Sequence, residues 1–267
     1  MASDTLNAQQ ELRSKPLGVP ITVQGLTKRF NREPLYQDFN LEISAGKITC
    51  IFGPNGCGKS TLLNMIAGLI PIDAGQILFG DKLLHKTRIG YVFQNYRDAL
   101  YPWLRAIDNI KYPLKVARYS STQQRMRVEE LVHLFSTNIN LNRYPYELSG
   151  GQQQLVSIMR ALAIQPEVLF LDEPFSALDY EATLLIRDKL QGVLQASGLT
   201  MVMISHDLEE AVYMADHILL LTKRPTQVAE RVEFNAKRPR TAATLADAEF
   251  IQVRSHCLEV FQREVYR

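Results

Sequence analysis

The feature that most constrains this chain is a glycine-rich stretch ending in a lysine and two hydroxyl residues, Gly53-Pro54-Asn55-Gly56-Cys57-Gly58-Lys59-Ser60-Thr61. The stretch fits the pattern G-x-x-x-x-G-K-[ST] of a phosphate-binding P-loop. Residues 48–52 before it are apolar and predict a buried strand, and residues 62–67 predict a helix that stops at Gly68 and Pro71. A strand, a glycine loop and a helix in this order favour a binding site over a chance turn.

The residue types of this loop explain why it would bind phosphate. Glycines allow the backbone to turn tightly, so that successive N–H groups converge on an anion, and the helix N-terminus adds partial positive charge. The Lys59 ammonium can then contact the β- and γ-phosphates, and the Ser60 hydroxyl can bind Mg²⁺. The stretch therefore predicts a site for the phosphates of a nucleotide.

Composition and charge exclude several other classes of protein. The 267 residues allow one large domain or two small ones, and a net charge of +2 gives no general attraction to nucleic acid or to a membrane surface. No apolar run approaches the length of about 20 residues that a membrane-spanning helix needs. The three cysteines have no paired or metal-ligand spacing, which favours a reducing compartment. A protein of this kind acting at a membrane needs a partner that spans it.

Polar side chains follow three further apolar stretches that read as buried strands. Gln94 follows residues 89–93, Asp172 and Glu173 follow residues 168–171, and His206 follows residues 199–204. In an α/β sheet the carboxyl ends of the strands border the ligand crevice, so we expect these side chains to converge. Asp172 then suits a Mg²⁺ site, and Glu173 is placed to accept a proton from an attacking water. Alone, Gln94 reads equally well as a surface residue that opens a loop.

A second glycine stretch precedes a predicted helix that ends near residue 164. Its residues Ser149, Gly150, Gly151 and Gln152 offer a hydroxyl, flexible backbone N–H groups and a helix N-terminus, which together suit an anion. An ordinary helix cap is an equally good reading of Ser149. Upstream, Phe30 lies between two predicted strands that include residues 21–23 and 39–43. It could stack on adenine, although its spacing alone favours a core or edge aromatic.

Three further segments have no assigned role in nucleotide binding, and the sequence suggests a structural interpretation for each. The aromatic patch 100–104, with the only tryptophan, is either a docking surface or local core. The basic cluster 237–240 reads as a solvated turn. The last segment predicts an amphipathic helix that packs on its own domain, because apolar residues recur at helical spacing at Ala246, Phe250, Val253, Cys257, Phe261 and Val265.

Taken together, residues 21–225 resemble an ATP-binding cassette (ABC) ATPase, with the family's motifs in order. Residues 53–61 are similar to the Walker A motif, Gln94 to the Q-loop glutamine, 148–152 to the signature sequence, 168–173 to the Walker B motif with its glutamate, 176–179 to the D-loop, and His206 to the switch histidine. Phe30 lies where the family has an adenine-stacking aromatic, and the resemblance reverses the preference that spacing alone gave.

The resemblance implies a fold and a division of the chain. We expect an α/β P-loop NTPase of the ABC type, with a mixed sheet core, an α-helical subdomain over about residues 95–165 and a short C-terminal strand and helix extension. The expected parts are a flexible tail at 1–18, the ATPase domain at 19–225 and the extension at 226–267. Within the helical subdomain, residues 106–116 and 122–135 have helical periodicity.

The resemblance also implies ATP and Mg²⁺ as ligands and a second ATPase subunit as partner. Two subunits would pair head to tail, with ATP between the Walker A motif of one and the signature loop of the other. Ser149, Gly150, Gly151, Gln152 and Asp179 would thus contribute to nucleotide binding across the interface. Ser60, Gln94 and Asp172 would form the metal environment, Glu173 would polarise the attacking water, and His206 would sense the γ-phosphate.

Weaker signals resemble the ATPases of importers for nitrate, sulfonates, taurine and bicarbonate. These signals are residues 102–104 after the Q-loop and the arginine-proline pieces at 224–225 and 238–240. They imply a multi-span permease that docks near Tyr101–Trp103, a solute-binding protein in the complex, and a peripheral location at the cytoplasmic face of the inner membrane. The alternative is a soluble ABC ATPase in an assembly or nucleic-acid complex, although the near-neutral charge argues against nucleic acid.

Two features depart from the family pattern. The interval from Gln94 to Trp103 is longer than usual, which would alter the fit to a partner. After the signature, Leu155, Ser157 and Met159 stand where the family usually has Arg, Ala and Ala. The missing arginine puts a local salt bridge in doubt, whereas the residues expected to act in catalysis are all present.

Overall fold

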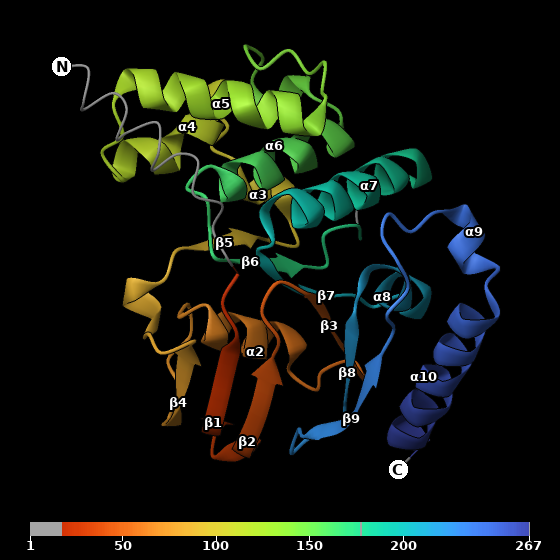
Figure 1. The fold of residues 1–267 in the computed structure, drawn as a ribbon. Helices are drawn as coiled ribbons and strands as arrows, with labels where there is room; N and C mark the ends of the chain where they lie inside the picture. Colours follow the sequence, from red (N-terminus) through yellow and green to blue (C-terminus); the bar gives the residue numbers. More distant parts are fainter. Residues whose placement is uncertain (1–17, 177, 267) are drawn as a thin grey trace.

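The computed structural model describes residues 18–176 and 178–266, so most of the expected tail lies outside the described residues. Two sheets lie beside each other (Figure 1). The smaller one has the order β2-β1-β4 and is antiparallel, with β1 at Ile21–Phe30, β2 at Glu33–Ile43 and β4 at Ala74–Phe79. The strand β1 is longer than expected and contains Phe30, which pairs with Glu33 across a tight turn at Asn31 and Arg32.

The larger sheet has six strands in the order β5-β6-β7-β3-β8-β9. Their bounds are Ile89–Val92 for β5, Val168–Asp172 for β6, Thr200–Ile204 for β7, Ile48–Phe52 for β3, His217–Leu221 for β8 and Val228–Glu233 for β9. The first five strands are parallel, and β9 is antiparallel to β8. The carboxyl ends of β3, β5, β6 and β7 therefore meet at one edge, which is where the sequence places its polar side chains.

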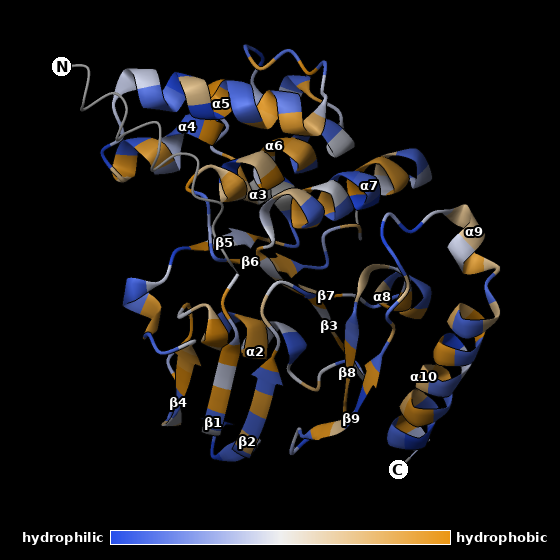
Figure 2. Ribbon diagram, in the orientation of Figure 1, coloured by the Kyte–Doolittle hydropathy of each residue, from blue (hydrophilic) through white to orange (hydrophobic). Residues whose placement is uncertain are grey.

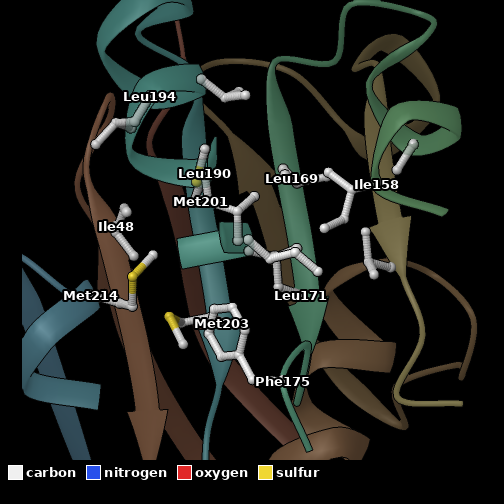
Figure 3. Packing of buried hydrophobic residues seen from close by; sticks show 14 of the residues in the cluster. Ile48, Ile158, Leu169, Leu171, Phe175, Leu190, Leu194, Met201, Met203 and Met214 are labelled. Carbon is white, nitrogen blue, oxygen red and sulfur yellow. The ribbon is translucent and has the colours of Figure 1, made fainter. Parts of the chain in front are cut away.

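Successive residues of the central strands point to opposite faces of this sheet and pack into two separate cores. On one face, Phe170 of β6 and Ile204 of β7 pack with α2 (Lys59–Ile66) and with the small sheet. On the other face, Leu171 and Met203 pack with the remaining large helices. Figure 3 shows this second core, in which Leu169, Leu171 and Met203 of the sheet lie near Ile158 and Leu190 of two helices. Strand alternation thus buries both faces, as expected for a parallel sheet.

The helices predicted at 106–116 and 122–135 agree with the observed bounds to within one residue. Besides α2, the structure has α3 at Tyr96–Ala99, α4 at Ala106–Val116, α5 at Ser121–Phe135, α6 at Gly150–Leu162, α7 at Tyr180–Ser197, α8 at Leu208–Met214, α9 at Ala242–Leu245 and α10 at Ala248–Tyr266, with short 3-10 turns at Leu84–Lys86 and Pro145–Glu147. Helices α3 to α6 follow β5 and cover one end of the molecule (Figure 1). This arrangement agrees with the α/β fold and helical insertion that the sequence resemblance implies. No helix in the described ranges is long and apolar enough to cross a bilayer.

The helix α10 packs against α8, β8 and β9. Phe250, Cys257 and Val260 are buried in this contact, and Figure 2 shows hydrophobic and hydrophilic bands alternating along the helix. The predicted stripe began one turn too early, because Ala246 is exposed and precedes the helix. The packing matches an amphipathic helix that covers its own domain.

The prediction of a solvated turn at residues 237–240 was wrong. The Arg240 side chain has no exposed surface, and the Arg238 side chain is only 9% exposed. Both guanidinium groups contact Asp216 Oδ1, at 3.3 Å from Arg240 and 2.9 Å from Arg238. Arg240 also donates to the carbonyls of Val212 and Ala215 at the end of α8. A buried carboxylate and free helix-end carbonyls therefore satisfy charges that composition alone assigns to solvent.

Candidate nucleotide site

The P-loop connects β3 to α2 at the carboxyl edge of the large sheet. Gly58 caps α2 with a φ of 104°, a conformation that side chains disfavour, and a Cβ there would lie 2.9 Å from Leu35 Cδ1. The Lys59 ammonium donates to the carbonyls of Gly53 at 2.9 Å and Pro54 at 3.2 Å. The lysine side chain therefore lies over its own loop, where its ammonium group can donate to phosphate oxygens in place of these carbonyls.

The other predicted loop residues occupy the turn between these elements. Pro54 and Cys57 are buried, Asn55 and Gly56 are exposed, and Thr61 lies half-buried in the first turn of the helix.

Ser60 and Asp172 come together from α2 and β6, as expected of two metal-binding residues. The Ser60 hydroxyl donates to Asp172 Oδ1 at 3.1 Å. Burial raises the pKa of Asp172 above its usual value, and the bond from Ser60 opposes this rise in part. In the part of the chain that the structure describes, no cluster of three His, Cys, Asp or Glu side chains could hold a metal alone. One carboxylate and one hydroxyl suit Mg²⁺, which keeps waters and binds substrate phosphates.

Gln94, Glu173 and His206 meet just beyond the ends of three strands. Gln94 Nε2 donates to Glu173 Oε2 at 2.9 Å, and His206 Nδ1 lies 3.2 Å from the same oxygen. The backbone of Glu173 has a φ of 46°, in the left-handed region that a residue with a side chain rarely adopts. Backbone strain of this kind is often found at functional sites. The convergence predicted from the strand ends is therefore confirmed, because one carboxylate, one amide and one imidazole meet there.

The glycine stretch of residues 149–152 lies at the start of α6. Ser149 accepts a hydrogen bond from the Gln152 N–H at 3.3 Å, and Gln152 Oε1 accepts one from the Ser149 N–H at 3.1 Å. A Cβ on Gly151 would lie 2.7 Å from Ala182 Cβ, so α6 starts close against α7. Gly150 and Gly151 are half-buried, and Ser149 is exposed. The helix cap and the potential anion site thus coexist at the same residues.

The two glycine loops belong to opposite faces of the large sheet. The helix α2 packs in the core that contains Phe170 and Ile204, whereas α6 packs in the core that contains Leu171 and Met203. The two loops therefore start helices that pack on different faces of the sheet. That residues 149–152 serve the nucleotide of a second subunit stays a prediction.

Two other predicted residues lie at element ends. Asp179 caps α7, and its Oδ1 accepts a hydrogen bond from the Ala182 N–H at 2.8 Å. Ala177 of the D-loop stretch lies outside the described residues. Phe30 is 46% exposed at the end of β1, with the Lys28 ammonium 5.4 Å from its ring centre. An exposed ring has a face available for stacking, which a core aromatic lacks.

Sequence reasoning missed several residues that shape this site. Arg224, Thr226 and Tyr36 donate hydrogen bonds to the carbonyls of Gly56, Cys57 and Gly58. The buried Ser205 beside His206 donates to Glu210 at 2.7 Å, and Arg187 donates to the same carboxylate at 3.0 Å. No local sequence pattern predicts these contacts, because their residues belong to none of the motifs and most of them are far apart in the chain.

The three departures after the signature are all core residues. Leu155, Ser157 and Met159 are at most 2% exposed on α6. A position where the family usually has arginine therefore contributes apolar packing in this chain. The Ser157 hydroxyl is buried without a partner among the described residues.

The site combines a P-loop on a parallel sheet, strand-end Asp172, Glu173 and His206, and a second helix that Ser149 caps and two glycines begin. This combination defines the class of P-loop ATPases with an ATP-binding cassette. The sequence profile of the ABC transporter family matches residues 36–176. The chain therefore belongs to the ABC transporter family, whose cassettes are ATPases. This agrees with the resemblance found in the motifs.

Among individual proteins, the chain is similar to ATP-binding proteins named for import. The chain is 37% identical to the taurine import ATP-binding protein TauB of Yersinia pseudotuberculosis over 254 residues, which cover 92% of this chain and 99% of that protein. It is also 37% identical to the sulfate/thiosulfate import ATP-binding protein CysA of Neisseria meningitidis over 83% of this chain, but the match spans only 64% of that protein.

Solved structures agree on the fold. A dimeric bacterial ABC transporter cassette is 30% identical, with a TM-score of 0.70 over 81% of this chain and all of that chain. A dimeric post-hydrolysis state of an ATP-binding cassette, bound to ADP and Pi, is 31% identical with a TM-score of 0.69.

Proposed function

We propose that this chain is the ATP-hydrolysing subunit of an ABC importer that takes up a small anion or a sulfonate-type solute, of the nitrate, sulfonate, taurine or bicarbonate class. The observation that carries the hydrolytic part is the contact of Gln94 and His206 with one carboxylate oxygen of Glu173, next to the Ser60–Asp172 pair. Relatives named for taurine import and for sulfate/thiosulfate import support the cargo class.

In this proposal the P-loop amides and Lys59 hold the phosphates of ATP. Ser60, Asp172 and Gln94 would hold Mg²⁺, which neutralises phosphate charge when bound. Phe30 stacks on the adenine with its exposed ring face. These groups position ATP, and positioning with charge stabilisation supplies most of the acceleration in phosphoryl transfer.

Glu173 accepts the proton of the attacking water in the proposed hydrolysis. The Gln94 amide orients its carboxylate by donating to Oε2, and His206 contacts the same oxygen from the end of β7. The His206 side chain is 56% exposed, so it can turn from the carboxylate towards a γ-phosphate. A base whose orientation is set by two neighbours is ready for proton transfer before ATP arrives.

A second ATPase subunit, identical or paralogous, completes the site. Residues 149–152 and Asp179 of one subunit would contact the nucleotide held by the P-loop of the other, because they lie on the far face of their own sheet. ATP then bridges the two subunits and favours the closed pair, and loss of phosphate reopens it. The solved cassettes of similar sequence are dimeric, which supports this arrangement.

A multi-span permease is the proposed membrane partner, and it would hold the chain at the cytoplasmic face of the inner membrane. Trp103 is 70% exposed, and the ring of Tyr101 lies 4.8 Å from that of Tyr112. A pocket of about 280 Å³ between β5, α4 and α6 is lined in part by Tyr101 and Tyr112. Its lining includes Phe93 and Arg160. An aromatic rim on a pocket suits a short apolar helix of a partner.

The hydrolytic part is tested by Mg²⁺-dependent phosphate release from the purified chain, with Lys59→Ala as the inactive comparison. The import part is tested in the native host, where the gene is replaced by the Lys59→Ala form. Uptake of labelled nitrate, taurine, an alkanesulfonate and bicarbonate is then compared between this strain and the wild type. In a second experiment the chain is extracted in detergent, and a permease and a solute-binding protein are sought among the proteins that co-purify with it. Loss of uptake of one solute supports the proposal. Unchanged uptake of all four, with the chain bound to a soluble assembly, points to the alternative ATPase role.

A further inference from the structure

Three side chains from outside the P-loop hold three consecutive carbonyl groups of that loop. Arg224 Nε donates to the Gly56 carbonyl at 2.8 Å, and the Tyr36 hydroxyl donates to the Gly58 carbonyl at 3.0 Å. Between them, the Thr226 hydroxyl donates to the Cys57 carbonyl. These donors come from β2 and from the connection between β8 and β9, so the contacts join three distant parts of the chain.

Tyr36 and Thr226 form one unit. They pair as an isolated parallel β-bridge, and the Thr226 N–H donates to the Leu35 carbonyl at 2.9 Å. Neither Tyr36 nor Thr226 has any exposed surface. Because both are fixed by the main chain and by packing, their hydroxyl groups face the P-loop without a loss of side-chain freedom when ligand binds.

Fixing the carbonyls also fixes the amides. In a planar trans peptide the C=O of one residue and the N–H of the next point in opposite directions. Anchoring the carbonyls of Cys57 and Gly58 therefore turns the N–H groups of Gly58 and Lys59 towards the other side of the backbone. These are amides of the stretch that cradles phosphate in a P-loop.

We propose that Tyr36 and Thr226 are positioning residues that hold the P-loop amides in the arrangement that binds nucleotide phosphates, with Arg224 as an auxiliary donor. This inference rests on the proposed nucleotide site and adds a device that none of its motifs contains. The loop has glycines at Gly56 and Gly58, both with positive φ, so its own backbone resists peptide rotation weakly. The Gly58 carbonyl also accepts from the Leu62 N–H at 2.8 Å in the first turn of α2, so Tyr36 adds a second donor there, whereas Thr226 constrains the Cys57 carbonyl from outside the loop.

The two hydroxyl groups allow a test that leaves charge unchanged. Burial raises the pKa of Tyr36, which keeps the phenol protonated as a donor at neutral pH. Tyr36→Phe and Thr226→Val each remove one donor and keep nearly the same volume. Arg224 is exposed and cationic, so its removal would also weaken electrostatic attraction to ATP and is not used as the deciding variant.

The expected result is a loss of nucleotide affinity with retention of turnover. When the competent loop conformation is only partly populated, the apparent Kd rises by the inverse of its fraction. Loss of one such bond should weaken ADP binding about fivefold, and the double variant should weaken it more. KM for ATP should rise in parallel, whereas kcat at saturating ATP should stay close to that of the wild type. Thr226→Ser keeps the hydroxyl and should restore affinity.

Two matched variants separate positioning from general stability. The Tyr213 hydroxyl donates to the Arg240 carbonyl at 2.6 Å, and the Thr200 hydroxyl donates to the Val19 carbonyl at 2.8 Å, both away from the P-loop. Tyr213→Phe therefore loses one such bond elsewhere, and Thr200→Val loses this bond together with the one that its hydroxyl accepts from the Gly46 N–H at 3.0 Å. They should lower the melting temperature as the loop variants do, but leave ADP affinity unchanged.

Calorimetric titration with ADP and Mg²⁺ gives the decisive readout for all these proteins. Weaker binding in the two loop variants, rescue by Thr226→Ser and normal binding in the matched variants support the inference. Wild-type affinity in both loop variants overturns it while the nucleotide site stands. An equal loss in the matched variants also overturns it. A wild-type chain that binds no nucleotide overturns both proposals, whereas failure of the uptake experiment alone leaves the positioning role intact.

Discussion

Gln94 Nε2 lies 2.9 Å from Glu173 Oε2, although 79 residues separate the two in the chain. The strands β5 and β6 are neighbours in the sheet, so their ends deliver the two side chains to the same place. His206 reaches the same carboxylate oxygen from the next strand, β7. The proposed base is thus oriented by partners from both neighbouring strands, and its role can be tested by changes that preserve shape.

Glu173→Gln should reduce kcat for ATP hydrolysis by at least about a hundredfold, because an amide cannot accept the proton of the attacking water. ATP binding should persist, and the variant should form an ATP-dependent dimer, since the amide has nearly the shape of the carboxylate. Phosphate release and light scattering with and without ATP measure the two effects. Glu259→Gln, an exposed change on α10, serves as the control. Full hydrolysis by Glu173→Gln would contradict the assigned base.

Asp172→Asn should separate stability from function. Burial raises the pKa of Asp172, so its folded-state pKa lies above that of the unfolded chain. The native protein therefore binds this proton more tightly, and the contribution to the free energy of unfolding falls as the pH rises between the two pKa values. At neutral pH the variant should melt no lower than the wild type without Mg²⁺, yet lose Mg²⁺-dependent hydrolysis. Asp81→Asn, an exposed change, should alter neither property. A marked drop in the melting temperature of Asp172→Asn would contradict the raised pKa of Asp172.

Ser205→Ala should lower kcat about tenfold with little change in KM. The Ser205 hydroxyl donates to the Glu210 carboxylate at 2.7 Å and accepts from the Asp207 N–H at 3.0 Å, so it ties the residue before His206 to the backbone after it and to α8. Without it, the imidazole should be less well oriented in the transition state. Steady-state kinetics measure the change, with Ser197→Ala at the end of α7 as control. An unchanged kcat would show that these bonds do not position His206.

Much of the fold and the site could be predicted because their determinants are local. The P-loop pattern, the apolar strand at 168–171 and the helical periodicity of 106–116 each need only a short window of sequence. The polar strand ends could be combined because parallel strands share one edge. The convergence of Gln94 and His206 on Glu173 follows from this rule.

Other features depend on contacts that no local pattern carries. Thr226 contacts the P-loop carbonyl of Cys57 across 169 residues, and only the folded chain brings them together. The position of Phe30 inside β1 depends on pairing with β2. The burial of Arg240 depends on Asp216 and on the free carbonyls of α8, which a solvated-turn reading of the basic cluster ignores.

The pH dependence of stability should contain a component from His217. Burial lowers the pKa of His217, and the nearby cation Arg231 lowers it further, against opposing effects of Glu233 and Asp216. The folded-state pKa thus lies below the unfolded value, so the unfolded chain binds more protons and stability falls as the pH drops below about 6.5. His217→Gln should flatten this loss in urea titrations. His85→Gln, an exposed change, should leave the slope as in the wild type. An unchanged slope for His217→Gln would contradict the lowered pKa.

Arg240→Met should strongly destabilise the fold, since it removes a guanidinium with no exposed surface. The change leaves Asp216 with one cation fewer and strips donors from the carbonyls of Val212 and Ala215. Removing one partner of a buried charge network costs about 3–5 kcal/mol. Lys237→Ala, in the same basic cluster but exposed, should change the free energy of unfolding by less than about 0.5 kcal/mol. Urea unfolding followed by circular dichroism measures both. Equal stability of the two variants would mean that Arg240 is solvated, and the C-terminal segment would then lack its anchor to α8.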